Sequence, residues 1–136
     1  MVNRTRMLPF QLAFKTGVPA YEQVVYAVKK AVICGALKPG DRFPSVRAMS
    51  QELRINPNTA HKVVAALVNE RLLEVRPGIG TVVADARPAT REQRRELLGE
   101  DVEQVVVEAK NLQLDMQDVI EAVQQHWDRL SKEEKP

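Results

Sequence analysis

Between residues 45 and 80 the chain carries several side chains that can hold a phosphate or read the edge of a base pair. Arg47 can pair with a phosphate, and a helix that begins at Ser45 would aim its first N–H groups at the same anion. Asparagine, threonine and histidine can hydrogen-bond to base edges, whereas lysine suits a phosphate. The candidate residues of this kind are Ser45, Arg47, Asn58, Thr59, His61, Lys62, Arg76 and Gly78.

Two helices and a hairpin are needed to position these side chains. Ser45 is a good N-cap for a short helix, and Asn56 is a good N-cap for a second one with Pro57 at its first position. The β-like runs 72–76 and 80–84 flank Pro-Gly-Ile, whose turn chemistry favours a hairpin. This order is typical of a winged helix-turn-helix, whose second helix enters a DNA major groove.

Each of these residues also has a simpler interpretation. Ser45 and Asn56 could do no more than cap helices, and Arg47 could be a solvated surface charge. His61 taken alone is more typical of a surface histidine, and Arg76 could belong to a tight turn only. The order of cap, turn, cap and hairpin favours the nucleic-acid interpretation, because a winged helix requires that order.

The chain before residue 45 completes the expected domain, residues 8–84. Apolar residues at helical spacing predict a helix from Ala20 that ends at Gly35 as its C-cap, and Lys38-Pro39-Gly40-Asp41 predicts a turn. Alternating apolar residues predict a short strand through Phe10, Leu12 and Phe14.

The net charge of +2 is the sum of two unlike halves. Residues 1–84 hold 12 Lys/Arg and 5 Asp/Glu, whereas residues 85–136 hold 8 and 13. A net +7 against a net −5 indicates that the first half alone meets a polyanion, although ordinary surface charge would produce a similar count. The single cysteine fits a reducing compartment, and no apolar run is long enough to span a membrane, so we expect a cytoplasmic protein with no membrane partner.

The chain lacks the residue groups that an enzyme needs. Cys34, His61 and His126 have no motif partner that would make a nucleophile–base pair or a metal site. Gly78-Ile79-Gly80 lacks the third glycine and the strand-to-helix setting of a dinucleotide fingerprint. We therefore expect no catalytic residue, no metal and no cofactor.

Residues 90–131 are expected to form a two-helix region after a linker at 85–89. One helix is predicted from about Thr90 to Leu112 and a second after Asp115, and both carry apolar stripes. These stripes could fold back on the winged helix or pair with a second chain, and we favour the homodimer. The predicted dimer contacts are Val102, Val105, Val106, Ala109, Val119, Ile120, Val123 and Trp127. Residues 1–7 and 132–136 are expected to be disordered tails.

The same motifs resemble those of a known family, the GntR bacterial transcriptional regulators. The resemblance spans roughly residues 10–84, and the two short helices that follow are similar to the YtrA-like subfamily. It rests on Pro19-Ala20-Tyr21-Glu22-Gln23, on Gly35-Ala36-Leu37-Lys38-Pro39-Gly40-Asp41-Arg42-Phe43-Pro44-Ser45-Val46-Arg47, on Asn56-Pro57-Asn58-Thr59 and on Gly78-Ile79-Gly80-Thr81.

The resemblance implies a mostly α fold with a small β-hairpin wing, DNA contacts at the eight candidate residues and a tail that dimerises the protein. Three residues depart from the family pattern: His61 replaces the usual arginine, and Arg54 and Arg71 replace the usual glycines. Arginine in a left-handed turn would be strained, while its charge could strengthen phosphate contact.

We therefore expect a sequence-specific transcriptional repressor that binds a palindromic operator in double-stranded DNA as a homodimer. The alternative is a winged-helix adaptor or an RNA-binding module. RNA binding would favour exposed aromatic side chains, and the wing has none. A small-molecule effector cannot be inferred from the sequence.

Overall fold

The computed structural model describes residues 8–10 and 12–132 of the chain. Contacts within it define two compact units, the first ending at Ala86 and the second spanning Arg87–Lys132. Residues 1–7 and 133–136 of the expected tails lie outside the described residues, whereas Lys132 is the last residue of a helix. In the part that is described, no helix is both long and apolar enough to cross a membrane.

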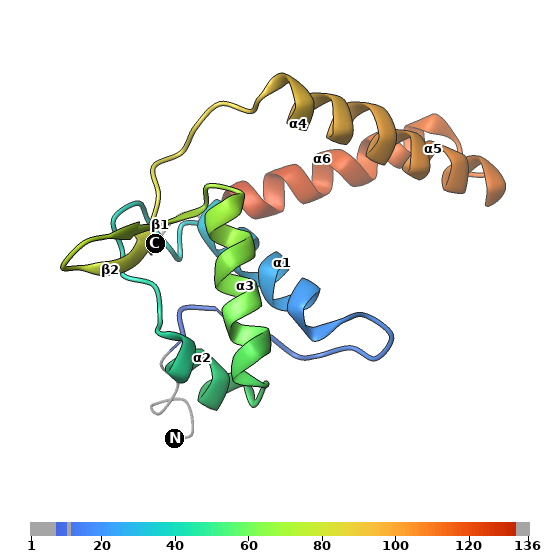
Figure 1. Cartoon of the computed structure of the whole chain (residues 1–136). Helices are drawn as coiled ribbons and strands as arrows, with labels where there is room; N and C mark the ends of the chain where they lie inside the picture. The colour runs from blue at the N-terminus through green and yellow to red at the C-terminus, as the bar shows by residue number, and fades with distance from the viewer. Residues whose placement is uncertain (1–7, 11, 133–136) are drawn as a thin grey trace. The chain divides into compact units, whose positions relative to one another are not determined.

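The first unit contains three helices and a β-hairpin (Figure 1). Helix α3 packs against α1, against α2 and against the first hairpin strand, so it lies at the centre of the unit. The bounds are α1 (Ala20–Ile33), α2 (Val46–Leu53), α3 (Pro57–Asn69), β1 (Leu73–Arg76) and β2 (Gly80–Val83). Its largest fully buried side chains are those of Met49, Leu67, Leu73, Val24, Val28, Val63, Val82 and Val83.

Side-chain caps fix where α2 and α3 begin. The Ser45 hydroxyl oxygen accepts a hydrogen bond from the Ala48 N–H at 3.0 Å, and the Asn56 side-chain oxygen accepts one from the Asn58 N–H at 2.7 Å. Pro57 occupies the first position of α3, where its missing N–H costs no helical bond. The structure thus confirms both predicted caps.

Four helix ends share one left-handed backbone pattern. The residue with positive φ is Gly35 after α1, Arg54 after α2 and Arg71 after α3 (φ 84°, 58° and 66°). At each end the next N–H bonds back to the carbonyl five residues earlier, as at Leu72 to Leu67 and Ile55 to Ser50. Arg54 and Arg71 therefore do adopt the left-handed conformation of the glycines that they replace, and the fourth left-handed residue, Gln113, has no counterpart in the sequence-based prediction.

The hairpin forms with the predicted turn and gains a neighbour that the sequence did not indicate. Strands β1 and β2 pair antiparallel from Leu73↔Val83 to Arg76↔Gly80, with positive φ at both tip glycines. Residues 40–43 run along the other edge of β2: the Phe43 N–H donates to the Thr81 carbonyl, and Arg42 bridges Val82. The predicted turn at 38–41 is confirmed, and it feeds this extra edge.

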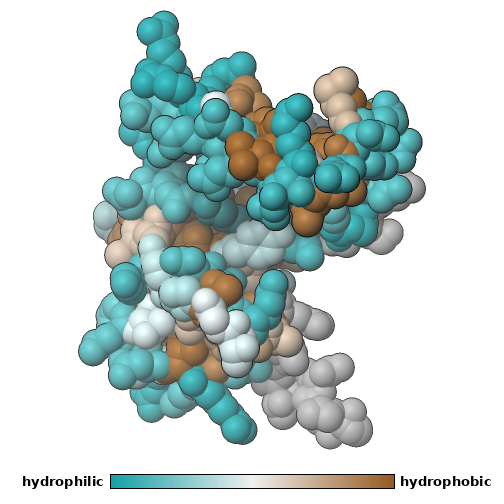
Figure 2. All heavy atoms as spheres, turned by 90° about the vertical axis from the view of Figure 1, so that its right-hand side faces the viewer, coloured by the Kyte–Doolittle hydropathy of each residue, from teal (hydrophilic) through white to brown (hydrophobic). Residues whose placement is uncertain are grey.

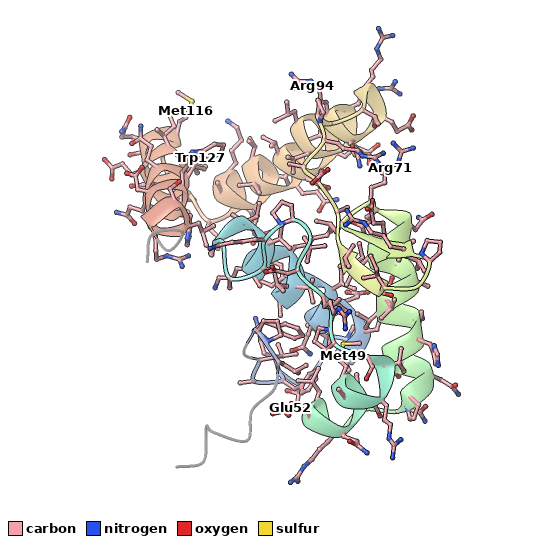
Figure 3. The ribbon with its side chains drawn as sticks, turned by 90° about the vertical axis from the view of Figure 1, so that its left-hand side faces the viewer. Met49, Glu52, Arg71, Arg94, Met116 and Trp127 are labelled. Atoms are coloured by element: carbon pink, nitrogen blue, oxygen red, sulfur yellow. The ribbon has the colours of Figure 1, made fainter. Side chains whose placement is uncertain are left out.

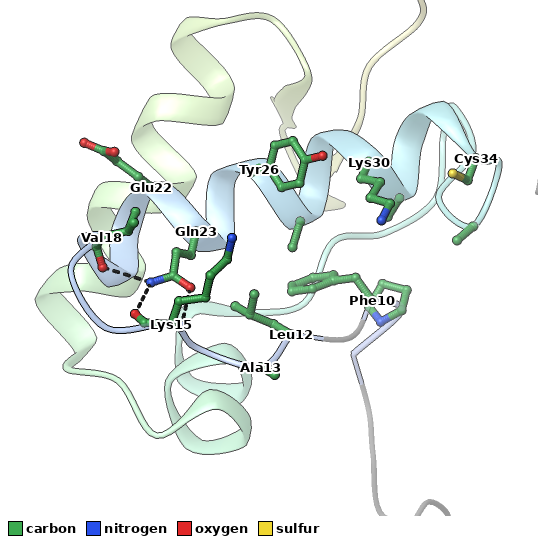
Figure 4. Close-up of a pocket in the computed structure, with 14 residues that line it drawn as sticks. Phe10, Leu12, Ala13, Lys15, Val18, Glu22, Gln23, Tyr26, Lys30 and Cys34 are labelled. Atoms are coloured by element: carbon green, nitrogen blue, oxygen red, sulfur yellow. Dashed lines mark hydrogen bonds between the residues drawn. The ribbon is translucent and has the colours of Figure 1, made fainter. Parts of the chain in front are cut away.

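The predicted strand through Phe10, Leu12 and Phe14 is wrong, because these residues form no strand. Phe10 is buried and stacks on Phe43, whereas Phe14 is exposed. The backbone that follows is held by the buried Gln23 of α1, whose amide exchanges two 2.9 Å hydrogen bonds with Lys15 (Figure 4). A side chain, and not a strand partner, thus satisfies the backbone N–H and carbonyl of Lys15.

The second unit consists of two helical stretches. The predicted helix from Thr90 to Leu112 is present as α4 (Arg91–Arg95), η2 (Glu96–Asp101), which has π-helical bonding, and α5 (Val102–Asn111). The η2 segment contains Gly99, whose low helix propensity favours a local change of winding. Helix α6 (Met116–Lys132) follows a turn through the left-handed Gln113.

Candidate nucleic-acid interface

The start of α2 presents an anion-binding group of the expected kind. Ser45 and Arg47 are exposed, and the first intrahelical bond runs from the Met49 N–H to the Ser45 carbonyl. The N–H groups of Val46 and Arg47 precede that bond, so they are available to an outside acceptor at the positive end of the helix. Arg47 adds a full charge beside them.

The start of α3 lies against the start of α2. A hollow of about 450 Å³ lies between the two helices, and both Arg47 and His61 line it. Asn58 and His61 are exposed, and Thr59 is half-buried. The remaining lining residues are Val46, Ser50, Gln51 and Pro57. The fold therefore places Arg47, a cation suited to a phosphate, and His61, which can hydrogen-bond to a base edge, on one surface. The two residues lie 14 positions apart in the sequence.

Lys62 lies one turn further along α3 and is held by an aromatic ring. Its Nζ atom lies 4.6 Å from the centroid of the Tyr21 ring, which belongs to the first turn of α1. This distance is within the range of a cation–π interaction. Lys62 itself is exposed, so its ammonium group can meet an outside anion while it remains over the ring.

The wing also carries a positive residue that a neighbouring side chain holds, in this case a carboxylate. Arg76, at the end of β1, donates through Nε to the Glu74 carboxylate at 2.7 Å. Beyond it, Gly78 and Ile79 form an exposed tip, and the tip turn closes with a bond from the Ile79 N–H to the Arg76 carbonyl. The φ of Gly78 is 79°, a backbone conformation that residues with a side chain rarely adopt, so the glycine makes this tight turn possible.

Comparison with known proteins agrees with this arrangement. Residues 20–83 match the model of the bacterial regulatory proteins, gntR family. The HTH-type transcriptional repressor YtrA of Bacillus subtilis is 31% identical over 100 residues, which cover 73% of this chain and 77% of the relative. The chain belongs to the GntR family.

Further matches place this GntR protein among the small, YtrA-like members. The HTH-type transcriptional regulator YhcF of Bacillus subtilis is 29% identical over 110 residues, 81% of this chain and 91% of the relative. The structure of a transcriptional antiterminator from Listeria monocytogenes superposes with a TM-score of 0.81 over 90% of this chain and 92% of that one; its 21% identity supports the fold alone. The chain is thus a DNA-binding transcriptional regulator of the GntR type.

Two of the three departures from the GntR pattern lie at opposite ends of α3. Arg54 occupies the turn between α2 and α3, two residues before Asn56, the N-cap of α3. Arg71 follows the far end of α3 (Figure 3). Thirteen helical residues separate the two ends by about 20 Å, so the two arginines cannot serve the same phosphate.

Two residues that sequence reasoning did not assign to the interface support its cations. Tyr21 fits the apolar spacing of its helix and packs on the core, yet its ring also supports Lys62. Glu74 had no assigned role. The two-residue period of a strand, which places Glu74 and Arg76 on one face, was the available signal.

The described residues hold no group of three or more His, Cys, Asp or Glu side chains that could bind a metal ion. The His126 ring instead meets Arg129, one turn along α6, through its Nδ1 atom at 2.9 Å. Cys34 is buried at the end of α1.

Proposed function

We propose that this protein is a transcriptional repressor that binds a palindromic operator as a homodimer. The observation that carries the proposal is the shared surface at the starts of α2 and α3, where Arg47 and His61 line one hollow. The net charge of +7 on residues 1–84 favours a polyanionic partner for this unit. A repressor acting on chromosomal DNA would work in the cytoplasm, as the sequence leads us to expect.

The proposed contacts divide by their chemistry. Ser45 and Arg47 bind a phosphate through the helix N-terminus and the guanidinium group, and Lys62 binds a second phosphate. Asn58, Thr59 and His61 face the base edges of the major groove, because the first turns of a recognition helix make such contacts. At the wing, Arg76 and the backbone at Gly78 approach the neighbouring minor groove.

The second unit supports the homodimer. Within one chain Val102, Val105 and Val106 of α5 are 42%, 52% and 41% exposed, and Trp127 of α6 is 73% exposed. Figure 2 shows apolar side chains gathered on the surface of these helices. Ala109 is buried and Val119 is half-buried already in one chain, while Ile120 and Val123 are exposed beside them. An apolar surface of this kind is typical of a protein interface.

We propose the domain division that the chain composition suggests. Residues 8–84 form the DNA-binding domain, residues 85–89 the linker, and residues 90–131 the dimerisation region. A two-fold axis would then present two recognition helices to two half-sites about one helical turn apart, which accounts for a palindromic operator. An expressed fragment of residues 1–86 that folds and binds duplex weakly as a monomer would support this division.

The function is tested by selecting duplexes from sheared genomic DNA and from a randomised pool with the full-length protein. We expect a recovered sequence with two inverted half-sites, bound far more tightly than unrelated duplex at the same salt concentration. Binding that never exceeds the salt-sensitive background would overturn the proposal. In that case, tight capture of a single-stranded RNA would favour an RNA-binding module, and the absence of any nucleic-acid preference would favour an adaptor.

A further inference from the structure

Lys62 and Tyr21 join the recognition helix to the first helix of the domain. The Lys62 ammonium lies 4.6 Å from the centroid of the Tyr21 ring, and α1 and α3 pack directly on each other. Lys62 belongs to neither the Lys29–Glu70 nor the Arg76–Glu74 ion pair. Its described partner is therefore an aromatic face, which attracts a cation without neutralising its charge.

Tyr21 is a fixed support, whereas a lysine is flexible. The ring is half-buried and packs against the core cluster, so its position follows from the packing of α1. A lysine has a flexible four-carbon stem, and an exposed lysine loses side-chain freedom when its ammonium binds a phosphate. A ring that already restrains the ammonium reduces that loss.

We propose that Tyr21 is a positioning residue that holds the Lys62 ammonium in place for a DNA phosphate. An ammonium has three N–H donors, so one can face the ring while the others remain for an oxygen acceptor. Tyr21 acts through Lys62 and has no contact with DNA of its own in this arrangement. The inference rests on the proposed DNA-binding function and adds to it a residue from outside the helix-turn-helix.

The test is a double-mutant cycle on the selected duplex, with the full-length protein. Tyr21→Leu keeps apolar bulk and removes the ring, Tyr21→Phe keeps the ring, and Lys62→Met removes the charge. We expect Tyr21→Leu to weaken binding about two- to fivefold, the range of an exposed cation–π contact, and Tyr21→Phe to bind like the wild type. In the Lys62→Met background, Tyr21→Leu should have no further effect.

Two results of the cycle would overturn the inference. An equal loss from Tyr21→Leu in both backgrounds would show that Tyr21 acts through the fold alone. Tighter binding by Tyr21→Leu would show that the ring competes with the phosphate for the ammonium. If the wild type binds no duplex above background, the proposed function fails and the inference fails with it; wild-type binding without coupling removes only the role of Tyr21.

A measurement on the free wild-type protein covers the case in which Tyr21→Leu does not fold. Protons above an aromatic face resonate upfield, so the Lys62 methylene protons next to the ammonium should shift upfield relative to those of the exposed Lys38. Tyr21→Phe should retain this shift. Identical signals for the two lysines would show that the contact does not exist in solution, and the inference would fall.

Discussion

Glu74 accepts a hydrogen bond from the Nε atom of Arg76 at 2.7 Å, along one face of the first wing strand. The two side chains are 37% and 39% exposed, so the pair contributes at most about 1 kcal/mol to folding. The pair instead affects how the Arg76 guanidinium is oriented and how much positive charge the wing carries. The bond fixes the guanidinium plane and leaves the Nη donors for another acceptor, while the carboxylate offsets the charge that the wing presents to DNA.

Removing that carboxylate should strengthen DNA binding. We expect Glu74→Gln to raise duplex affinity by up to about fivefold at low salt, since a unit charge about 4 Å from a phosphate is worth about 1 kcal/mol in water. Arg76→Ala should have the opposite effect and reduce the slope of log affinity against log salt by about one. Fluorescence anisotropy across a salt series measures both quantities.

The matched control for this prediction is Glu70→Gln. Glu70 forms a surface ion pair of the same length, with Lys29, at the far end of α3. Glu70→Gln removes the same negative charge from the same unit as Glu74→Gln does. The comparison therefore isolates the effect that the position of the charge has on DNA affinity. Equal gains from Glu74→Gln and Glu70→Gln would show that total charge, and not the wing pair, controls the affinity.

The features that sequence reasoning predicted correctly have local causes. Ser45 and Asn56 cap the helices that follow them because a short polar side chain can reach an N–H two or three residues on. The hairpin depends on Gly78 and Gly80, which supply the positive φ angles of the tip. Each of these features depends on residues only a few positions away in the sequence, so a single sequence is enough to predict it.

The features that it missed depend on distant partners. Phe10 lies in the core and stacks on Phe43, a partner far along the chain, instead of joining a strand. Gln113 adopts a left-handed conformation that its type does not indicate. The contact between Tyr21 and Lys62 links two helices that sequence periodicity treats separately. Such relationships become visible only once the helices are packed.

Arg47 and Asn58 should differ in how their loss affects binding. Arg47→Ala is expected to weaken all duplexes similarly, by about 1–3 kcal/mol, and to lower the salt slope by about one, because it removes a phosphate contact. Asn58→Ala should instead reduce the preference for the operator over a mutated operator by about 1–3 kcal/mol at an unchanged slope. Lys30→Ala, on α1, is the control and should leave both quantities unchanged. A shared phenotype would contradict the assigned roles.

Arg54 combines a backbone cost with a charge that we expect to be useful. Its φ of 58° is unfavourable for a side chain, so Arg54→Gly should stabilise the fold by up to about 1 kcal/mol in urea unfolding, after the entropy that glycine gains in the unfolded chain. The same change should weaken DNA binding, because Arg54 adds charge next to the start of α3. Asparagine tolerates the left-handed conformation but carries no charge, so Arg54→Asn should weaken DNA binding as much as Arg54→Gly does.

Arg71 is the comparison for Arg54. It has the same conformation, with φ of 66°, at the other end of α3. Arg71→Gly should therefore stabilise the fold to a similar extent and reduce DNA affinity less. Unchanged affinity and salt slope in both variants would remove the idea that the two arginines replace glycine for the sake of phosphate contact.

A charged residue introduced into the apolar face of α5 or α6 should prevent dimerisation. Val106→Asp and Val123→Asp are expected to convert a dimer into a monomer in sedimentation velocity runs, because an unpaired carboxylate would be buried in the interface. The two residues are 41% and 53% exposed in one chain, so each can carry the charge in a folded monomer. Val107→Asp is the control: Val107 is 60% exposed and lies outside the predicted stripe, and its variant should remain dimeric.

The single tryptophan gives an independent measure of the same event. Trp127 is 73% exposed in one chain, so burial by a second copy should shift its fluorescence to shorter wavelength. Dilution of the wild type through the dimer dissociation constant should reverse the shift, and Val106→Asp should show the emission of exposed tryptophan at every concentration. A wild type that sediments as a monomer with exposed Trp127 at micromolar concentration would contradict the dimer, and with it the expectation of a palindromic operator.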